Sequence, residues 1–256
     1  MKTGLVSISF RKLSPLEIVT AAAGAGLDCI EWGGDVHVPH GDTARAEEVA
    51  RLTADHGLSI SAYGSYLRLN GDSEPSPAAV LDSASALGAQ TIRVWAGKKG
   101  SASTTPEERS MVVETALSFA DLASARGMSI SYEFHGGTFT DTGESAALLL
   151  AETSHPAIFS LWQPTVGLTT EACLDALQKV LPRLSNVHAF HWWPTQANRL
   201  PLIEGRERWI SFLGTIHAAG KNPDVLLEFL PNDNIAALPA EAAALREIIA
   251  DSVASR

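Results

Sequence analysis

The sequence is poor in cysteine, and this shortage excludes two classes of site. Only Cys29 and Cys173 occur among 256 residues, far apart and in apolar segments. Two such cysteines are typical of buried thiols in a reducing compartment, so the sequence excludes a disulfide framework. A structural zinc site built from several thiolates is excluded for the same reason.

Basic clusters and long apolar runs are also missing. Lys and Arg total 19 against 29 Asp and Glu, which gives a net charge of -10. No basic block is present of the kind that neutralises phosphates, so a nucleic-acid partner is disfavoured. No apolar run approaches the roughly 20 residues of a transmembrane helix. The opening "MKTGLVSISF" is too short and strand-like for a signal peptide. We therefore expect a cytoplasmic protein with no nucleic-acid partner and no membrane partner.

What the chain does contain is a regular alternation of β-rich runs and amphipathic, Ala- and Leu-rich segments. The segment 14–26 illustrates a helix start, because Ser14 can cap, Pro15 suits the first turn and Glu17 completes a capping box. Eight runs are predicted to be strands: 5–9, 27–32, 58–63, 89–97, 128–134, 157–163, 187–193 and 224–230.

Eight β/α units in about 250 residues predict an α/β fold, a closed (β/α)8 TIM barrel that forms one domain over residues 1–256. The alternative is a doubly wound open sheet. It lacks support, because no G-x-G-x-x-G turn follows the first predicted strand.

Polar residues mark the ends of the last four predicted strands, where the active site of such a barrel lies. Strand by strand they are Glu133, Gln163, His188 and Glu228. Two carboxylates, an amide oxygen and an imidazole form a mixed oxygen and nitrogen site for a divalent cation. The set suits Mn²⁺, Mg²⁺ or Co²⁺, and Zn²⁺ remains an alternative.

Several short motifs resemble one known family. "EFHGG" (133–137), "WQP" (162–164), "VHAFHW" (187–192) and "LLEF" (226–229) are similar to the sugar phosphate isomerase/epimerase family, the xylose isomerase-like TIM barrels. "LDCIEWGGDVHVPHGD" (27–42) also fits. The resemblance covers nearly the whole chain, with the motifs in order on the expected strands.

The resemblance implies a metal site and a mechanism. The family typically holds its metal with Glu, Asp, His and Glu, and the matching residues are Glu133, Gln163, His188 and Glu228. Gln163 stands where the family usually has Asp, which removes one negative charge. In family epimerases two glutamates move a proton through a cis-enediolate while the metal polarises the carbonyl. The implied catalytic residues are Glu133 and Glu228, and the implied substrate is a sugar or sugar phosphate.

Six further residues near strand ends are candidates for substrate binding. Tryptophan suits stacking on the apolar face of a sugar, and an inward Arg93 would bind a carboxylate or phosphate. Strand alternation points His191 away from the barrel if His188 faces it, unless the strand has already ended. The predicted substrate-binding residues are His37, Arg93, Trp95, His135, Trp162 and His191.

Two other functions stay open at this point. One is a phosphodiesterase of the endonuclease IV type, which the acidic charge disfavours. The other is a non-catalytic sugar-binding barrel with a degenerate metal site, an alternative that Gln163 leaves open because it replaces the usual Asp. Many barrels of this kind pair through their outer helices, so a homodimer is also an open alternative.

Overall fold

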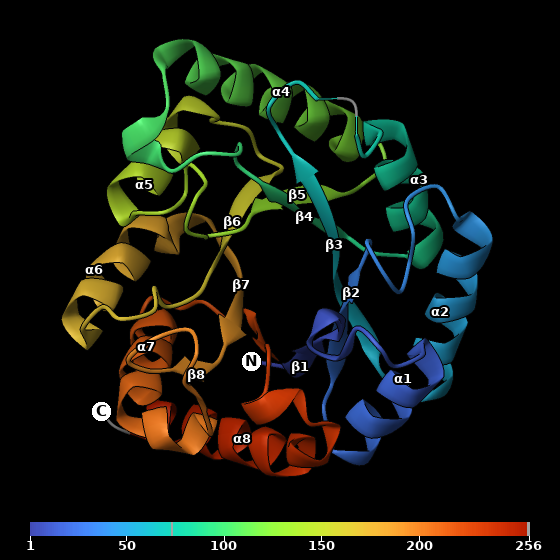
Figure 1. The fold of residues 1–256 in the computed structure, drawn as a ribbon, viewed down its shortest axis with the longest axis vertical. Coiled ribbons are helices and arrows are strands. Elements are labelled where there is room, and N and C mark those ends of the chain that lie inside the picture. The colour runs from blue at the N-terminus through green and yellow to red at the C-terminus, as the bar shows by residue number, and fades with distance from the viewer. Residues whose placement is uncertain (73, 255–256) are drawn as a thin grey trace.

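The fold is a closed barrel of eight parallel strands (Figure 1), seen in a computed structural model that describes residues 1–72 and 74–254. Parallel pairing of the first and last barrel strands, Thr3 with Val225, closes the ring. The predicted TIM barrel is therefore confirmed. The barrel strands are β1 (Thr3–Val6), β2 (Cys29–Gly33), β3 (Ser59–Arg68), β4 (Thr91–Trp95), β5 (Ser129–Tyr132), β6 (Ile158–Trp162), β7 (Leu184–Ala189) and β10 (Asp224–Leu227).

Helices surround the barrel in an outer ring (Figure 1). Ser14 and Thr105 begin two of them with complete capping boxes, which satisfy backbone N–H groups of the first turn. The α-helices are α1 (Pro15–Gly24), α2 (Thr43–Asp55), α3 (Pro77–Leu87), α4 (Pro106–Ser124), α5 (Gly143–Glu152), α6 (Thr170–Val180), α7 (Arg206–Ala218) and α8 (Leu238–Ala254). In the described part of the chain, no helix combines the length and the apolar character needed to cross a membrane.

Several predicted strands end earlier than the sequence indicated, the first and the seventh among them. β1 stops at Val6, and residues 7–10 form a 3-10 turn. β7 stops at Ala189, after which β8 (His191–Trp192) pairs antiparallel with β9 (Arg199–Leu200) in a small hairpin. The 3-10 turns are η1 (Ser7–Phe10), η2 (Ser101–Ser103), η3 (Leu181–Arg183), η4 (Leu202–Gly205), η5 (Pro231–Asp233) and η6 (Ile235–Ala237).

Apolar and polar side chains separate between the two faces of the barrel wall. Outward-facing residues such as Trp32 and Trp162 are fully buried in the hydrophobic core. Glu31, Arg93 and His188 are also almost completely buried, yet they contact one another from β2, β4 and β7, which are not neighbours in the sheet. Such contacts must cross the inside of the barrel. A polar network of these side chains therefore lies inside the barrel.

Candidate active site

A cavity of about 460 Å³ opens at the carboxyl ends of the strands. Its lining includes Arg93, Glu133, Gln163 and Glu228, which come from β4 or directly follow β5, β6 and β10. Because these strands are parallel, their carboxyl ends meet at one rim. The rim is thus the place where residues distant in sequence converge on one small-molecule-sized space.

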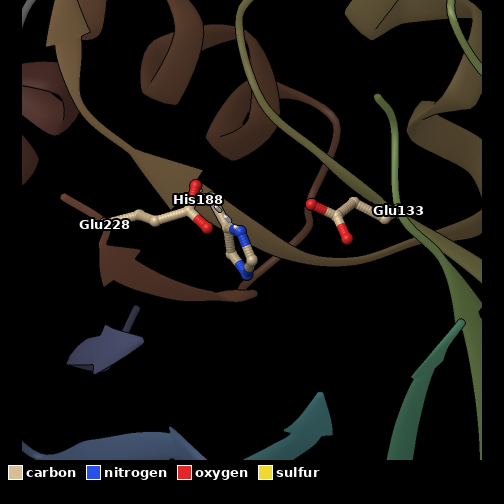
Figure 2. A group of neighbouring side chains, drawn as sticks. All are labelled: Glu133, His188 and Glu228. Atoms are coloured by element: carbon tan, nitrogen blue, oxygen red, sulfur yellow. Dashed lines mark ion pairs between the residues drawn. The ribbon is translucent and has the colours of Figure 1, made fainter. Parts of the chain in front are cut away.

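Three ligand-type side chains lie together beside this cavity. Glu133, His188 and Glu228 are all buried, and one ligand atom from each lies within 4.8 Å of the others. Figure 2 shows the two carboxylates approaching His188 from opposite sides. Carboxylate oxygens with one imidazole nitrogen are a donor set that divalent cations such as Mg²⁺, Mn²⁺ and Zn²⁺ accept.

Gln163 adds a fourth polar atom with an unusual feature. Its Nε2 donates a hydrogen bond of 2.9 Å to the Phe134 carbonyl. Its Oε1 is buried and has no hydrogen-bond partner among the described residues. Leaving a buried acceptor unpaired costs free energy, and a cation would pair it. The donor set present therefore fits a divalent metal, with Gln163 in the place that the family pattern gives to Asp.

Arg93 lies inside the barrel and joins two carboxylates. Its Nε donates to Glu31 Oε1 at 2.6 Å, and its Nη1 donates to Glu133 Oε2. Burial opposes its charge, but Glu133 and Glu31 outweigh this and raise the pKa of Arg93 well above its usual value. The sequence left open whether Arg93 faces the cavity. It lines the cavity, and both of these partners are the protein's own carboxylates.

Glu31 and His188 form the other half of the network. His188 Nε2 lies 3.0 Å from Glu31 Oε2, and both side chains are fully buried. Burial favours the neutral imidazole, yet Glu31 and Glu228 together raise the pKa of His188 to about 10. For Glu31 burial again opposes the charge, but His188 and Arg93 lower its pKa to about 2.

Gly64 on β3 provides the space for this arrangement. A Cβ at this position would lie 2.5 Å from Arg93 Nη2 and 3.0 Å from Glu31 Oε1. Real Cβ atoms do not approach other atoms so closely, so a larger residue would displace the ion pair. A glycine at this strand position is needed for the packing of the guanidinium rather than for a special backbone angle.

Aromatic residues form another wall of the cavity. His135 stacks on Trp95 with ring centroids 4.6 Å apart, and Arg68 lies over the same tryptophan at 4.1 Å. His135 Nδ1 lies 2.6 Å from the Gly136 carbonyl, so Nε2 is the ring nitrogen that this contact does not use. The chain turns after it with Gly137 at φ 75°, a conformation that favours glycine. Trp95 and His135, two of the residues predicted to bind substrate, both line the cavity.

Three of the predicted substrate-binding residues are not brought to this cavity. Trp162 points outward and packs against Trp209 and Phe212, because alternate side chains of β6 face the helix layer. His37 is buried with its Nδ1 3.0 Å from Ser7 Oγ. His191 begins the hairpin after β7 and lines a separate small pocket beside Arg208.

Sequence reasoning also missed residues that the structure places here. Glu31 was not among the predicted site residues, although a carboxylate inside the apolar run "CIEWG" is itself a signal of a buried partner. Tyr66 lines the cavity with φ 55° and lies under the Arg93 guanidinium at 4.7 Å. No pattern in the sequence marks Tyr66.

The chain belongs to the xylose isomerase-like TIM barrel family, whose sequence model matches residues 19–251. Among curated proteins, it is 28% identical over 207 residues to a 3-dehydroshikimate dehydratase of Bacillus anthracis, covering 73% of this chain and 71% of that protein.

Solved structures show the same fold. The crystal structure of AsbF, a probable 3-DHS dehydratase from Bacillus anthracis, superposes with a TM-score of 0.80 at 24% identity, covering 96% of this chain and 99% of that one. A xylose isomerase-like TIM barrel protein from Mycobacterium smegmatis, solved in complex with magnesium, gives a TM-score of 0.73 at 17% identity over 98% and 97% of the two chains.

Proposed function

We propose that the protein is a metal-dependent enzyme that removes the proton next to the carbonyl of a small polyhydroxylated substrate and then eliminates water. The observation that carries this proposal is the cluster of Glu133, His188 and Glu228 beside a cavity that His135 also lines. The identity to a 3-dehydroshikimate dehydratase supports a cyclic hydroxy ketone of that type as the substrate.

Glu133, His188 and Glu228, with Gln163 Oε1, are the residues that would hold the metal. A bound divalent cation supplies Lewis-acid stabilisation of the enolate oxygen. The choice among Mn²⁺, Mg²⁺, Co²⁺ and Zn²⁺ is left to metal analysis. Neutralising the charge that develops on the substrate is commonly the largest single contribution to such reactions.

The base of the dehydration is His135. One oxygen of Glu133 accepts from Arg93, and its other oxygen is needed for the metal, so Glu133 has no oxygen left for proton transfer. His135 lines the cavity, and among the described residues its ring makes a hydrogen-bond contact through Nδ1 and none through Nε2. It takes the proton from the carbon next to the carbonyl, and the C–H electrons form the enolate. The enolate then expels the hydroxyl one carbon further on, and the protonated His135 returns its proton to that group, so that water leaves and His135 is neutral again.

The second candidate is a sugar isomerase or epimerase, which one observation favours. Glu133 and Glu228 approach His188 from opposite sides (Figure 2), and two carboxylates so placed suit removal of a proton on one face and delivery on the other. In this alternative Glu133 would have to release Arg93 during turnover. A sugar or sugar phosphate would then be the substrate.

One assay compares the two candidates. The protein is purified, stripped with a chelator and reloaded with each of the four metals, and it is then supplied with 3-dehydroshikimate or with a panel of ketoses in D₂O. We expect metal-dependent formation of the ultraviolet-absorbing aromatic product from 3-dehydroshikimate, and none after chelation or in Glu228→Gln.

Three outcomes of that assay would contradict the proposal. Deuterium incorporation into an epimerised ketose without any dehydration would replace the first candidate by the second. Full activity after thorough chelation would overturn the metal-dependent mechanism. Nicking of DNA at abasic sites by the metal-loaded protein would favour the phosphodiesterase instead.

A further inference from the structure

We infer that Glu31 is a positioning residue that sets the geometry of the metal-binding side chains from inside the barrel. This inference rests on the metal site of the proposed function. It concerns a residue that does not line the cavity and is fully buried, so Glu31 acts only through its neighbours.

Each carboxylate oxygen of Glu31 contacts a different side chain of the site, one Arg93 and the other His188. Oε1 accepts from Arg93 Nε at 2.6 Å, and Oε2 faces His188 Nε2 at 3.0 Å. Asn186 Nδ2 also reaches Oε2, at 3.4 Å. One side chain from β2 therefore connects to ligand residues on the opposite half of the barrel.

The contact of Glu31 with His188 determines which ring nitrogen of His188 faces the cluster. Because Nε2 points to Glu31, Nδ1 is the nitrogen on the side of Glu228, 3.5 Å from its Oε2. Nδ1 is buried and makes no hydrogen bond within the described residues. A metal-binding histidine is commonly oriented by a carboxylate on its other nitrogen, which fixes the ring and makes it a better ligand.

The contact of Glu31 with Arg93 restrains the side chain of Glu133. The guanidinium is held by Glu31 on one edge and donates to Glu133 Oε2 from another. Gly64 leaves the room in which the pair sits. Removing the Glu31 carboxylate would therefore free both the ring of His188 and the cation that restrains Glu133.

The experiment measures Co²⁺ binding by calorimetry and by the visible absorption spectrum of the bound ion, with no substrate present. We expect Glu31→Gln to bind Co²⁺ at least tenfold more weakly than wild type, with an altered spectrum. Glu31→Asp, which keeps the charge but retracts it by one methylene, should lose affinity as well. Glu241→Gln is the matched control, since Glu241 is another buried carboxylate, on α8, that accepts from the Leu202 backbone and from no other residue that the structure describes. It should bind Co²⁺ as wild type does.

The outcomes separate this inference from the proposed function. Wild-type affinity and spectrum in Glu31→Gln or Glu31→Asp would overturn the positioning role while leaving the metal site intact. Failure of the wild-type protein to bind any of the four ions would overturn the metal site itself. If the variants do not fold, a crystal structure of the wild-type protein with Co²⁺ decides: cobalt on His188 Nδ1, with Nε2 on Glu31, supports the inference, and cobalt on Nε2 overturns it.

Discussion

His135 stacks on Trp95 at 4.6 Å, with the two ring planes inclined by 28°. This contact holds an imidazole against the wall of the cavity, and His135 is not one of the three clustered ligand-type side chains, Glu133, His188 and Glu228. The site thus combines a cluster with the character of a metal site and a histidine outside that cluster that lines the same cavity.

Replacing His135 should therefore stop proton transfer without emptying the metal site. For His135→Gln we expect the rate of dehydration to fall by about 10²- to 10⁴-fold, the usual contribution of a general base. Metal content should stay at the wild-type level. The matched control is His155→Gln, since His155 lies far from the cavity beside Asp121. An active His135→Gln would remove His135 from the mechanism.

A methyl group at position 64 should disturb the barrel interior. In Gly64→Ala the new Cβ meets Arg93 and Glu31, and overpacking of this kind costs about 1–3 kcal/mol. Gly24→Ala is the control, because nothing lies within 4 Å of that position near the end of α1 and alanine favours helices. Urea unfolding measures both variants. Equal stability of the two would contradict the tight fit around Arg93.

Gln163 should matter both for stability and for metal affinity. Gln163→Ala leaves the buried Phe134 carbonyl without its donor, which we expect to cost about 1–3 kcal/mol in urea unfolding of the metal-free protein. It should also weaken Mn²⁺ binding. Gln163→Asp restores a carboxylate at the position where the family usually has one and should bind Mn²⁺ about tenfold more tightly than wild type, a gain of about 1.4 kcal/mol. Calorimetric titrations showing the same affinity in all three proteins would exclude Gln163 as a ligand.

The stability of the metal-free protein should fall as the pH rises. His188 has a pKa of about 10 in the folded chain against an ordinary value of 6.5, so the folded state binds a proton that the unfolded state has lost. Its contribution is complete below pH 6.5 and disappears as the pH approaches 10. The slope is at most about 1.4 kcal/mol per pH unit.

Urea unfolding between pH 7 and 9 in the presence of a chelator measures this slope. His188→Asn provides the comparison, since it lacks the titrating group and should show a smaller dependence on pH. A wild-type stability that does not change over this range would contradict the strong pairing of His188 with Glu31 and Glu228.

The barrel could be predicted from the sequence because its signals are local. The capping box at Ser14 and the alternation of strands with helices are both present in the structure. Strand ends were harder. The predicted seventh strand continued to residue 193, whereas β7 ends at Ala189 and His191 lies in the hairpin of β8 and β9, outside the cavity.

The convergence of Glu133, His188 and Glu228 could also be predicted, because the carboxyl ends of parallel barrel strands lie at one rim. What could not be predicted was the partner of each charge. The sequence analysis assigned no partner within the chain to Glu133, and the structure supplies Arg93. That pairing joins neighbouring strands, β4 and β5, and the Arg93 guanidinium that makes it fits only because Gly64 has no side chain.

The buried network also bears on the valence of the ion that it admits. Glu31, Glu133 and Glu228 carry three negative charges when ionised, against one on Arg93 and one on a protonated His188, which leaves a single negative charge inside the barrel. A divalent cation that replaces the His188 proton brings the sum to zero. A monovalent ion in the same place leaves the interior negative, and a trivalent ion leaves it positive. In a medium that penalises uncompensated charge, the fold itself discriminates by ionic charge before size or geometry enters.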